Sequence, residues 1–96
     1  MGFAAIYRWS VEPAEEARFA RRWREGTDRL KALGGLGSCL CREDNGDFVA
    51  FARWPDEAAR ASAFQRIGTI EPWPGIVRFS ETRLLVLDDR LSGAGE

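Results

Sequence analysis

The chain contains no histidine in its 96 residues. Imidazole is the only side chain whose unperturbed pKa lies near neutral pH, so acid–base chemistry at pH 7 must use other groups. A histidine axial ligand for haem is impossible. The Ser-His-Asp and Cys-His arrangements of hydrolases are excluded for the same reason.

Cysteine is scarce, with only Cys39 and Cys41 present. The two residues lie two apart in a predicted strand, so they point to the same face and are poorly placed for a disulfide with each other. Two thiols without histidine are a poor ligand set for zinc. We therefore expect two small buried apolar side chains and no metal site.

Neither sign of charge dominates, because 14 basic residues are balanced by 15 acidic ones. A nucleic-acid footprint usually needs a basic excess, so we expect no nucleic-acid partner. No segment is long and apolar enough to span a bilayer, and the sequence opens without the pattern of a signal peptide. We expect no membrane partner and a cytoplasmic location.

Three stretches of the chain are apolar at nearly every position. A strand that is wetted on one face alternates apolar and polar residues, whereas a continuous run indicates that both faces are covered. The stretches are Phe3–Tyr7, Phe48–Ala52 and Leu84–Leu87.

Turn and capping residues divide the chain into four strands and two helices in the order βαββαβ. Pro13 suits the first position of a helix that Gly34-Gly35 ends, and Asp56 can cap the second helix. We expect strands at about 3–11, 36–43, 48–54 and 76–88, and helices at about 13–33 and 57–67. Residues 1–90 would form one domain, and residues 91–96 a flexible tail.

Two right-handed crossovers place both helices on one face of the sheet. The predicted fold is α+β, a ferredoxin-like domain with a four-stranded antiparallel sheet. Its helix-free face would carry Ile6, Val49 and Phe51, and would expose more apolar surface than a monomer normally shows. We therefore expect two sheets to pack face to face as a homodimeric α+β barrel.

Three ordered segments carry a resemblance to a known family. They are Phe19-x3-Trp23-x3-Thr27, Gly35-x-Gly37-Ser38-x-Leu40 and Asp44-Asn45-Gly46-x-Phe48-Val49-Ala50-x-Ala52-x-Trp54-Pro55. With these segments the chain resembles the antibiotic biosynthesis monooxygenase family of dimeric α+β barrels over about residues 3–88.

The resemblance implies a pocket between the helices and the sheet. Characterised members oxygenate aromatic or quinol-like substrates without metal or flavin, so no cofactor is expected. Trp54, which ends the third strand, is a pocket residue in such enzymes, and Tyr7 takes a first-strand position that is Asn in haem-degrading relatives. The implied function is cofactor-independent oxygenation of a small aromatic or polyketide-like substrate.

Two positions depart from the family's polar residues. Ala50 stands four residues before Trp54, where such oxygenases carry Asn, and Arg60 stands six residues after it, where some carry Tyr. The departures argue against haem degradation. They leave two alternatives open, a non-catalytic small hydrophobic ligand-binding or stress-associated dimeric barrel protein, and a barrel isomerase or cyclase.

Four aromatic residues are the expected substrate-binding residues, although each could equally serve as core packing. The hydroxyl of Tyr7 could donate a hydrogen bond to a substrate oxygen, and the indoles could stack on an aromatic ring. The four residues are Tyr7, Trp9, Trp23 and Trp54.

Other candidate residues are less defined by the sequence. An arginine such as Arg8, Arg53 or Arg78 could stabilise an anion, and the pattern does not decide which of them points inward. Gly26 falls inside the apolar stripe of the first helix, where glycine costs about 1 kcal/mol relative to alanine. It indicates either a close backbone approach to the sheet or room for a ligand beside Trp23.

Overall fold

The computed structural model describes residues 2–91, so residues 92–96 of the expected tail lie outside the described part of the chain. The elements follow the predicted order βαββαβ, with a short 3-10 turn, η1, before the first helix. They are β1 Phe3–Val11, η1 Pro13–Glu15, α1 Glu16–Ala32, β2 Gly37–Arg42, β3 Phe48–Trp54, α2 Glu57–Arg66 and β4 Ile76–Leu85.

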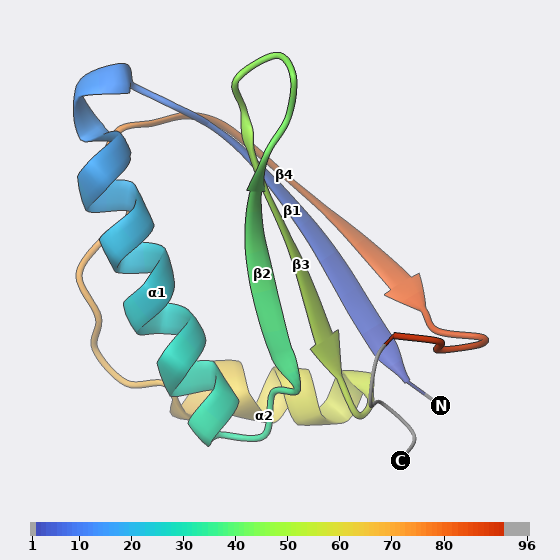
Figure 1. Cartoon of the computed structure of the whole chain (residues 1–96). Coiled ribbons are helices and arrows are strands. Elements are labelled where there is room, and N and C mark those ends of the chain that lie inside the picture. The colour runs from blue at the N-terminus through green and yellow to red at the C-terminus, as the bar shows by residue number, and fades with distance from the viewer. Residues whose placement is uncertain (1, 92–96) are drawn as a thin grey trace.

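The four strands form one antiparallel sheet in the order β2-β3-β1-β4. Both helices lie on one face of the sheet. Figure 1 shows α1 running beside the strands and α2 crossing their lower end. This arrangement confirms the predicted ferredoxin-like fold.

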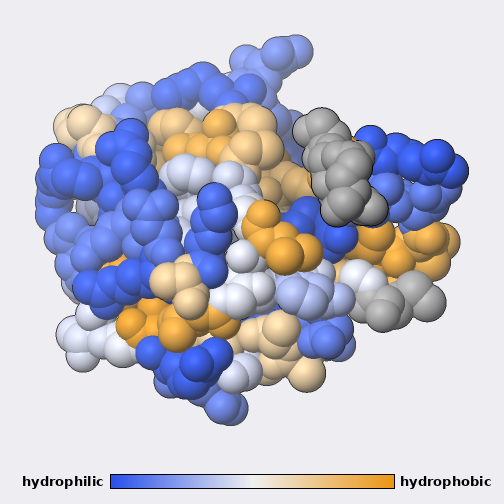
Figure 2. Space-filling model, turned by 60° about the horizontal axis from the view of Figure 1, so that its bottom comes forward, coloured by the Kyte–Doolittle hydropathy of each residue, from blue (hydrophilic) through white to orange (hydrophobic). Residues whose placement is uncertain are grey.

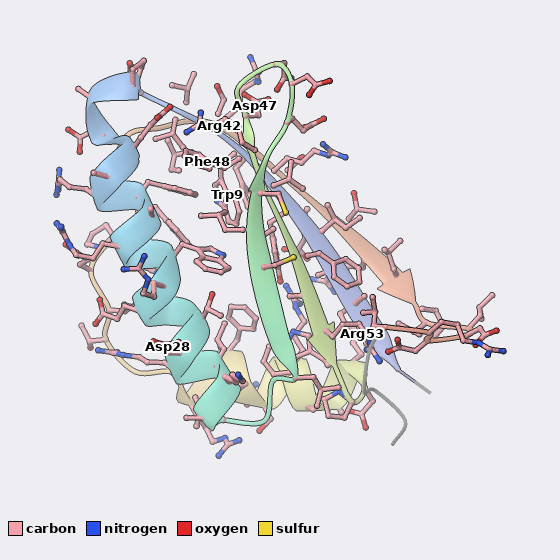
Figure 3. All side chains as sticks on the ribbon, in the orientation of Figure 1. Trp9, Asp28, Arg42, Asp47, Phe48 and Arg53 are labelled. Atoms are coloured by element: carbon pink, nitrogen blue, oxygen red, sulfur yellow. The ribbon has the colours of Figure 1, made fainter. Side chains whose placement is uncertain are left out.

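Alternation along β1 separates the two faces of the sheet as the sequence predicted. Tyr7 pairs with Ala50 and Trp9 pairs with Phe48 on the helix side. Figure 3 shows Trp9 and Phe48 pointing from the strands toward α1. The strands therefore present their largest aromatic side chains to the helix layer.

Most of the core lies on the helix side, in two clusters, and the buried Ala4 lies on the other face of the sheet. One gathers Phe3, Ala5, Trp54 and Ala63, and the other gathers Trp9, Phe19, Phe48 and Ala50. Phe19 is fully buried and packs against Trp9 and Phe48 with ring centroids 5.1 and 4.8 Å apart. Burying one such side chain stabilises the fold by about 1.5–3 kcal/mol, so Phe19 anchors α1 to the sheet.

The helix ends follow local chemistry. The backbone amide of Ala59 donates to the Asp56 carboxylate at 2.7 Å, which caps α2 as predicted. Gly34 has a φ of 118°, the left-handed conformation that ends α1. The last strand stops at Leu85 rather than Asp88, and an ion pair between Asp89 and Arg53 at 2.6 Å fixes the segment that follows the strand.

The helix-free face carries Ile6, Val49 and Phe51, as predicted, and all three are half-buried. Cys39 and Cys41 lie on the same face, opposite Phe51 and Val49. Both cysteines are exposed, with their Sγ atoms 4.0 Å apart. The expectation that they are buried is wrong for the single chain, because they lie on the outer strand β2 of the face that neither helix covers.

Large apolar side chains are also exposed at the end of β4 and just after it. Leu85 is 62% exposed and Leu87 is 83% exposed. The expectation that the last apolar run is covered on both faces therefore does not hold within one chain. Figure 2 shows apolar patches lying between charged side chains on the face that it presents.

Candidate functional site

A cavity of about 210 Å³ lies between α1, α2 and the helix side of the sheet. Its lining is mostly apolar and aromatic, which is typical of small-molecule sites. The four residues expected to bind substrate, Tyr7, Trp9, Trp23 and Trp54, all line it. The structure therefore brings these residues together around one space, and their role toward a ligand stays a prediction.

Trp54 closes one end of this cavity. The residue is only 2% exposed, and its indole Nε1 is buried with no hydrogen-bond partner among the described residues. A buried N–H without an acceptor costs free energy that most folded proteins avoid. Trp54 therefore lines the cavity and carries a buried donor that has no acceptor among the described residues.

A hydrogen-bonded triad joins the sheet to α2 at the cavity wall. Arg60 donates from Nε and Nη2 to the Tyr7 hydroxyl oxygen at 3.1 and 2.8 Å, and its Nη2 lies 3.2 Å from the Glu81 carboxylate. Because the Tyr7 oxygen already accepts two hydrogen bonds, its own proton is available as a donor. Arg60 is 9% exposed and its charge is balanced by Glu81.

The surroundings of Tyr7 keep its hydroxyl protonated. Burial raises the pKa of Tyr7 above its usual 10.0, while the hydrogen bonds and positive charge of Arg60 act in the opposite direction. Desolvation disfavours the phenolate, and this effect is the larger of the two. Tyr7 is therefore a hydrogen-bond donor near neutral pH.

Arg22 enters the cavity from α1 and is 8% exposed. Its Nε donates to the backbone carbonyl of Glu71 at 2.6 Å, and its guanidinium stacks on the Trp73 ring at 4.1 Å from the centroid. Its terminal amino groups make no hydrogen bond within residues 2–91, and no carboxylate of that range forms an ion pair with it. Burial lowers the pKa of Arg22, and Glu25 and Glu71 offset this only in part.

Gly26 makes room for Arg22. A Cβ at Gly26 would lie 2.6 Å from the Arg22 Nη1 atom and 3.7 Å from the Ile70 side chain, with no sheet atom nearby. The expected close approach to the sheet is therefore wrong. The alternative was room for a ligand beside Trp23. Gly26 does line the cavity, but the guanidinium of Arg22 occupies part of that room.

Of the three arginines proposed to stabilise an anion, Arg8 and Arg78 do not line the cavity, and Arg53 contributes to its lining but is paired with Asp89. Strand alternation places Arg8, Arg53 and Arg78 on the helix-free side, where they pair with Glu43, Asp89 and Asp47. Figure 3 shows Arg53 pointing away from α1, in contrast to Trp9.

The inward arginines are Arg60 and Arg22, which the sequence reasoning missed. A signal for them existed in helical spacing, since Arg60 lies three residues before the buried Ala63 and Arg22 three residues after the buried Phe19.

Within residues 2–91 no group of three or more His, Cys, Asp or Glu side chains is placed to hold a metal ion. Over the same range, no helix combines the length and apolar character needed to cross a membrane.

Comparisons with known proteins show which solved structures share this fold. No known protein family matches the sequence, and no curated protein is significantly similar to it. Solved structures do match. A protein named Rv0793 from Mycobacterium tuberculosis aligns with 94% of this chain and 99% of its own at 18% identity and a TM-score of 0.70.

The names of two further matches state an activity or a bound ligand. SnoaB, a cofactor-independent oxygenase from Streptomyces nogalater, shares 16% identity over 94% of this chain and 97% of its own, with a TM-score of 0.72. A variant of MhuD with two manganese protoporphyrin IX molecules per active site shares 15% identity over 91% of this chain and 96% of its own, with a TM-score of 0.73. The chain therefore has the ferredoxin-like fold shared by the antibiotic biosynthesis monooxygenase-type proteins.

Proposed function

We propose that this chain is a cofactor-independent monooxygenase that acts on a small aromatic or polyketide-like compound in the cavity between the helices and the sheet. The observation that carries the proposal is the apolar cavity lined by Tyr7, Trp23 and Trp54, in which the Tyr7 hydroxyl, held by Arg60, keeps its proton as a donor. An aromatic substrate bearing oxygen atoms would satisfy this donor while its ring packs against the indoles. The fold shared with a named cofactor-independent oxygenase supports this proposal.

Such chemistry needs little from the protein because the substrate supplies the electrons. An anthrone loses a proton, and the resulting anion passes one electron to dioxygen. The two radicals combine to form a C–O bond as a hydroperoxide, which loses water to leave a carbonyl. The net change converts a CH2 group and O2 into C=O and H2O.

The described residues suit three tasks in this sequence. The Tyr7 hydroxyl, held by Arg60, donates a hydrogen bond to the substrate oxygen on which negative charge develops. Glu81 is the one carboxylate among the residues that line the cavity in the described chain, and we assign it as proton acceptor. The tryptophans exclude water, which favours electron transfer from the anion to oxygen.

Oxygen uptake in the presence of an anthrone, without added metal or flavin, tests the proposal. We expect turnover by the wild-type protein and a loss of about tenfold or more in Trp54→Phe and Tyr7→Phe. Phe48→Leu is the matched control, because Phe48 belongs to the neighbouring core cluster and not to the cavity lining. The absence of turnover across a panel of anthrones and hydroquinones would contradict the proposal.

A non-catalytic binding protein is the second candidate, and Ala50 favours it. Ala50 is fully buried opposite Tyr7 and brings no polar group to the position where oxygenases of the resembled family carry Asn. This candidate predicts quenching of tryptophan fluorescence by anthrones and naphthols with no product formed. Product detection by mass spectrometry separates it from the oxygenase.

We also propose that two chains pack through their helix-free faces. Ile6, Val49 and Phe51 form an apolar surface there that neither helix covers. Sedimentation at micromolar concentration should give twice the 10.8 kDa of one chain, and Phe51→Asp should give the single chain. Modification of Cys39 and Cys41 by a thiol reagent should slow as the dimer forms. A stable wild-type monomer at that concentration would rule the dimer out.

A further inference from the structure

The most unusual charge in the molecule is the Arg22 guanidinium. Arg22 as a residue is more than nine-tenths buried and lines the cavity, yet no described carboxylate pairs with its guanidinium. Buried charges in proteins are normally paired, because desolvation of an isolated ion is costly. A buried cation that faces an open cavity therefore points to an anion that enters the cavity.

We propose that the ligand of this cavity is an aromatic carboxylate and that Arg22 holds its carboxylate group. This inference deepens the proposed function, on which it rests for the location of the site, by naming the charge and class of the substrate. Arg22 acts as a binding and specificity-determining residue toward this ligand.

The geometry around Arg22 prepares it for such a ligand. The carbonyl of Glu71 holds Nε, and the Trp73 ring holds one face of the guanidinium plane. These contacts orient the group without neutralising it. They leave both terminal amino groups free, and two parallel N–H donors match the two oxygens of a carboxylate. Because Gly26 has no side chain, the point 2.6 Å from Nη1 where a Cβ would lie stays free.

Two of the other cations that line the cavity are compensated, and the third, Lys31, is an exposed side chain in the last turn of α1. Arg60 is paired with Glu81, and Arg53 is paired with Asp89 on the opposite side of the sheet. The negative end of a ligand is therefore directed to Arg22 rather than to Arg60.

The remaining walls define the rest of the ligand. Trp23, Leu30 and Trp54 present apolar surface, and the Tyr7 hydroxyl can donate to a second oxygen. An apolar cavity of about 150 Å³ in another protein holds benzene, so about 210 Å³ admits one or two fused rings. The ligand class is a one- or two-ring aromatic acid with a further oxygen substituent.

Calorimetric titration with 3-hydroxy-2-naphthoate and with its neutral amide tests this inference. The two probes share ring system and hydroxyl group and differ in charge. The proteins are the wild type, Arg22→Gln, Arg22→Lys and the control Arg21→Gln, which removes an exposed arginine from the same helix. Thermal unfolding of each protein confirms that it is folded before titration.

We expect the wild type to bind the acid about tenfold or more tightly than the amide. Arg22→Gln should remove this preference through weaker binding of the acid, while Arg21→Gln retains it. Arg22→Lys loses the Glu71 contact but keeps the charge, so it should retain part of the preference. A purely structural Arg22 predicts instead that the lysine and glutamine variants behave alike.

Three results would overturn the inference. They are equal affinity of the wild type for acid and amide, no binding of the acid at all, and an unchanged preference in a folded Arg22→Gln. The assay contains no oxidisable anthrone and does not depend on turnover. Failure of the oxygenase proposal therefore leaves a measured acid preference standing, while oxygenation of neutral substrates without any acid preference overturns only this inference.

Discussion

Arg60 and Arg22 are buried to almost the same extent, at 9% and 8% exposed, and both line the same cavity. Arg60 donates twice to Tyr7 and pairs with Glu81, so its hydrogen bonds and charge are met within the protein. Arg22 has one backbone carbonyl and the face of one aromatic ring. Equal burial thus conceals different roles, because one arginine ties α2 to the sheet and the other keeps donors for a ligand.

The largest expected effect is on stability, and methionine variants of the two arginines measure it. Arg60→Met should lower the free energy of unfolding by about 2–3 kcal/mol, because Tyr7 and Glu81 lose a buried partner. Glu81 keeps its ion pair with Arg83, which limits the loss. Arg22→Met should change it by no more than about 1 kcal/mol, since it removes an unpaired charge. Urea denaturation at pH 7 measures both. Equal losses would remove the distinction between the two arginines.

The Trp54 N–H extends the comparison, because it too lacks a partner in the protein. Trp54→Phe keeps an aromatic ring and should cost about 1–2 kcal/mol of stability through lost volume. The affinity for the hydroxynaphthoate probe should fall severalfold, because the smaller ring gives up part of its contact with the probe. Calorimetry and urea denaturation separate the two effects. Unchanged affinity would show that the Trp54 side chain does not contact the probe.

Gly26→Ala sharpens the comparison without removing any charge. The added Cβ would lie 2.6 Å from the Arg22 Nη1 atom, so the guanidinium must shift. Alanine favours the helix by about 1 kcal/mol, so stability should not fall. The preference for the acid over the amide should fall severalfold, as measured by calorimetry. Retention of the full preference would indicate that the position of Arg22 is not critical.

The smallest effect concerns the titration of Tyr7. Burial raises its pKa above 10.0, so the folded protein retains the hydroxyl proton that the unfolded chain loses. Its contribution to stability is therefore complete below about pH 10 and is lost as pH rises through the folded pKa. Because Tyr7 is the single tyrosine of the chain, absorbance at 295 nm reports its ionisation directly. A midpoint at or below 10 would contradict the burial argument, and Tyr7→Phe should remove the absorbance change.

Much of the fold was predictable because its signals are local. Alternation fixed which residues of β1 face the helices, and Gly34 and Asp56 marked helix ends through backbone conformation and capping. The strand boundaries Phe3–Val11 and Phe48–Trp54 match the prediction. Periodicity and capping act over a few residues, so they can be read from a sequence.

The site was predictable only for its aromatic residues. Large aromatic side chains on an inward face line any cavity on that face, which is why Trp9 and Trp54 were found. The arginines were not found, because an arginine on a helix is normally solvated and its burial depends on what packs over it. Arg22 is covered by Trp73, which lies 51 positions away in the sequence.

The sequence by itself determined the order of elements, the two faces of the sheet and the absence of imidazole chemistry, since each depends on residue identity and short spacing. Only the tertiary structure decided which charges are paired. Ion pairs and hydrogen bonds such as those of Arg60 with Tyr7 and Glu81 join residues from separate elements. Their geometry exists only once helices and strands have packed, and so does the unpaired state of Arg22.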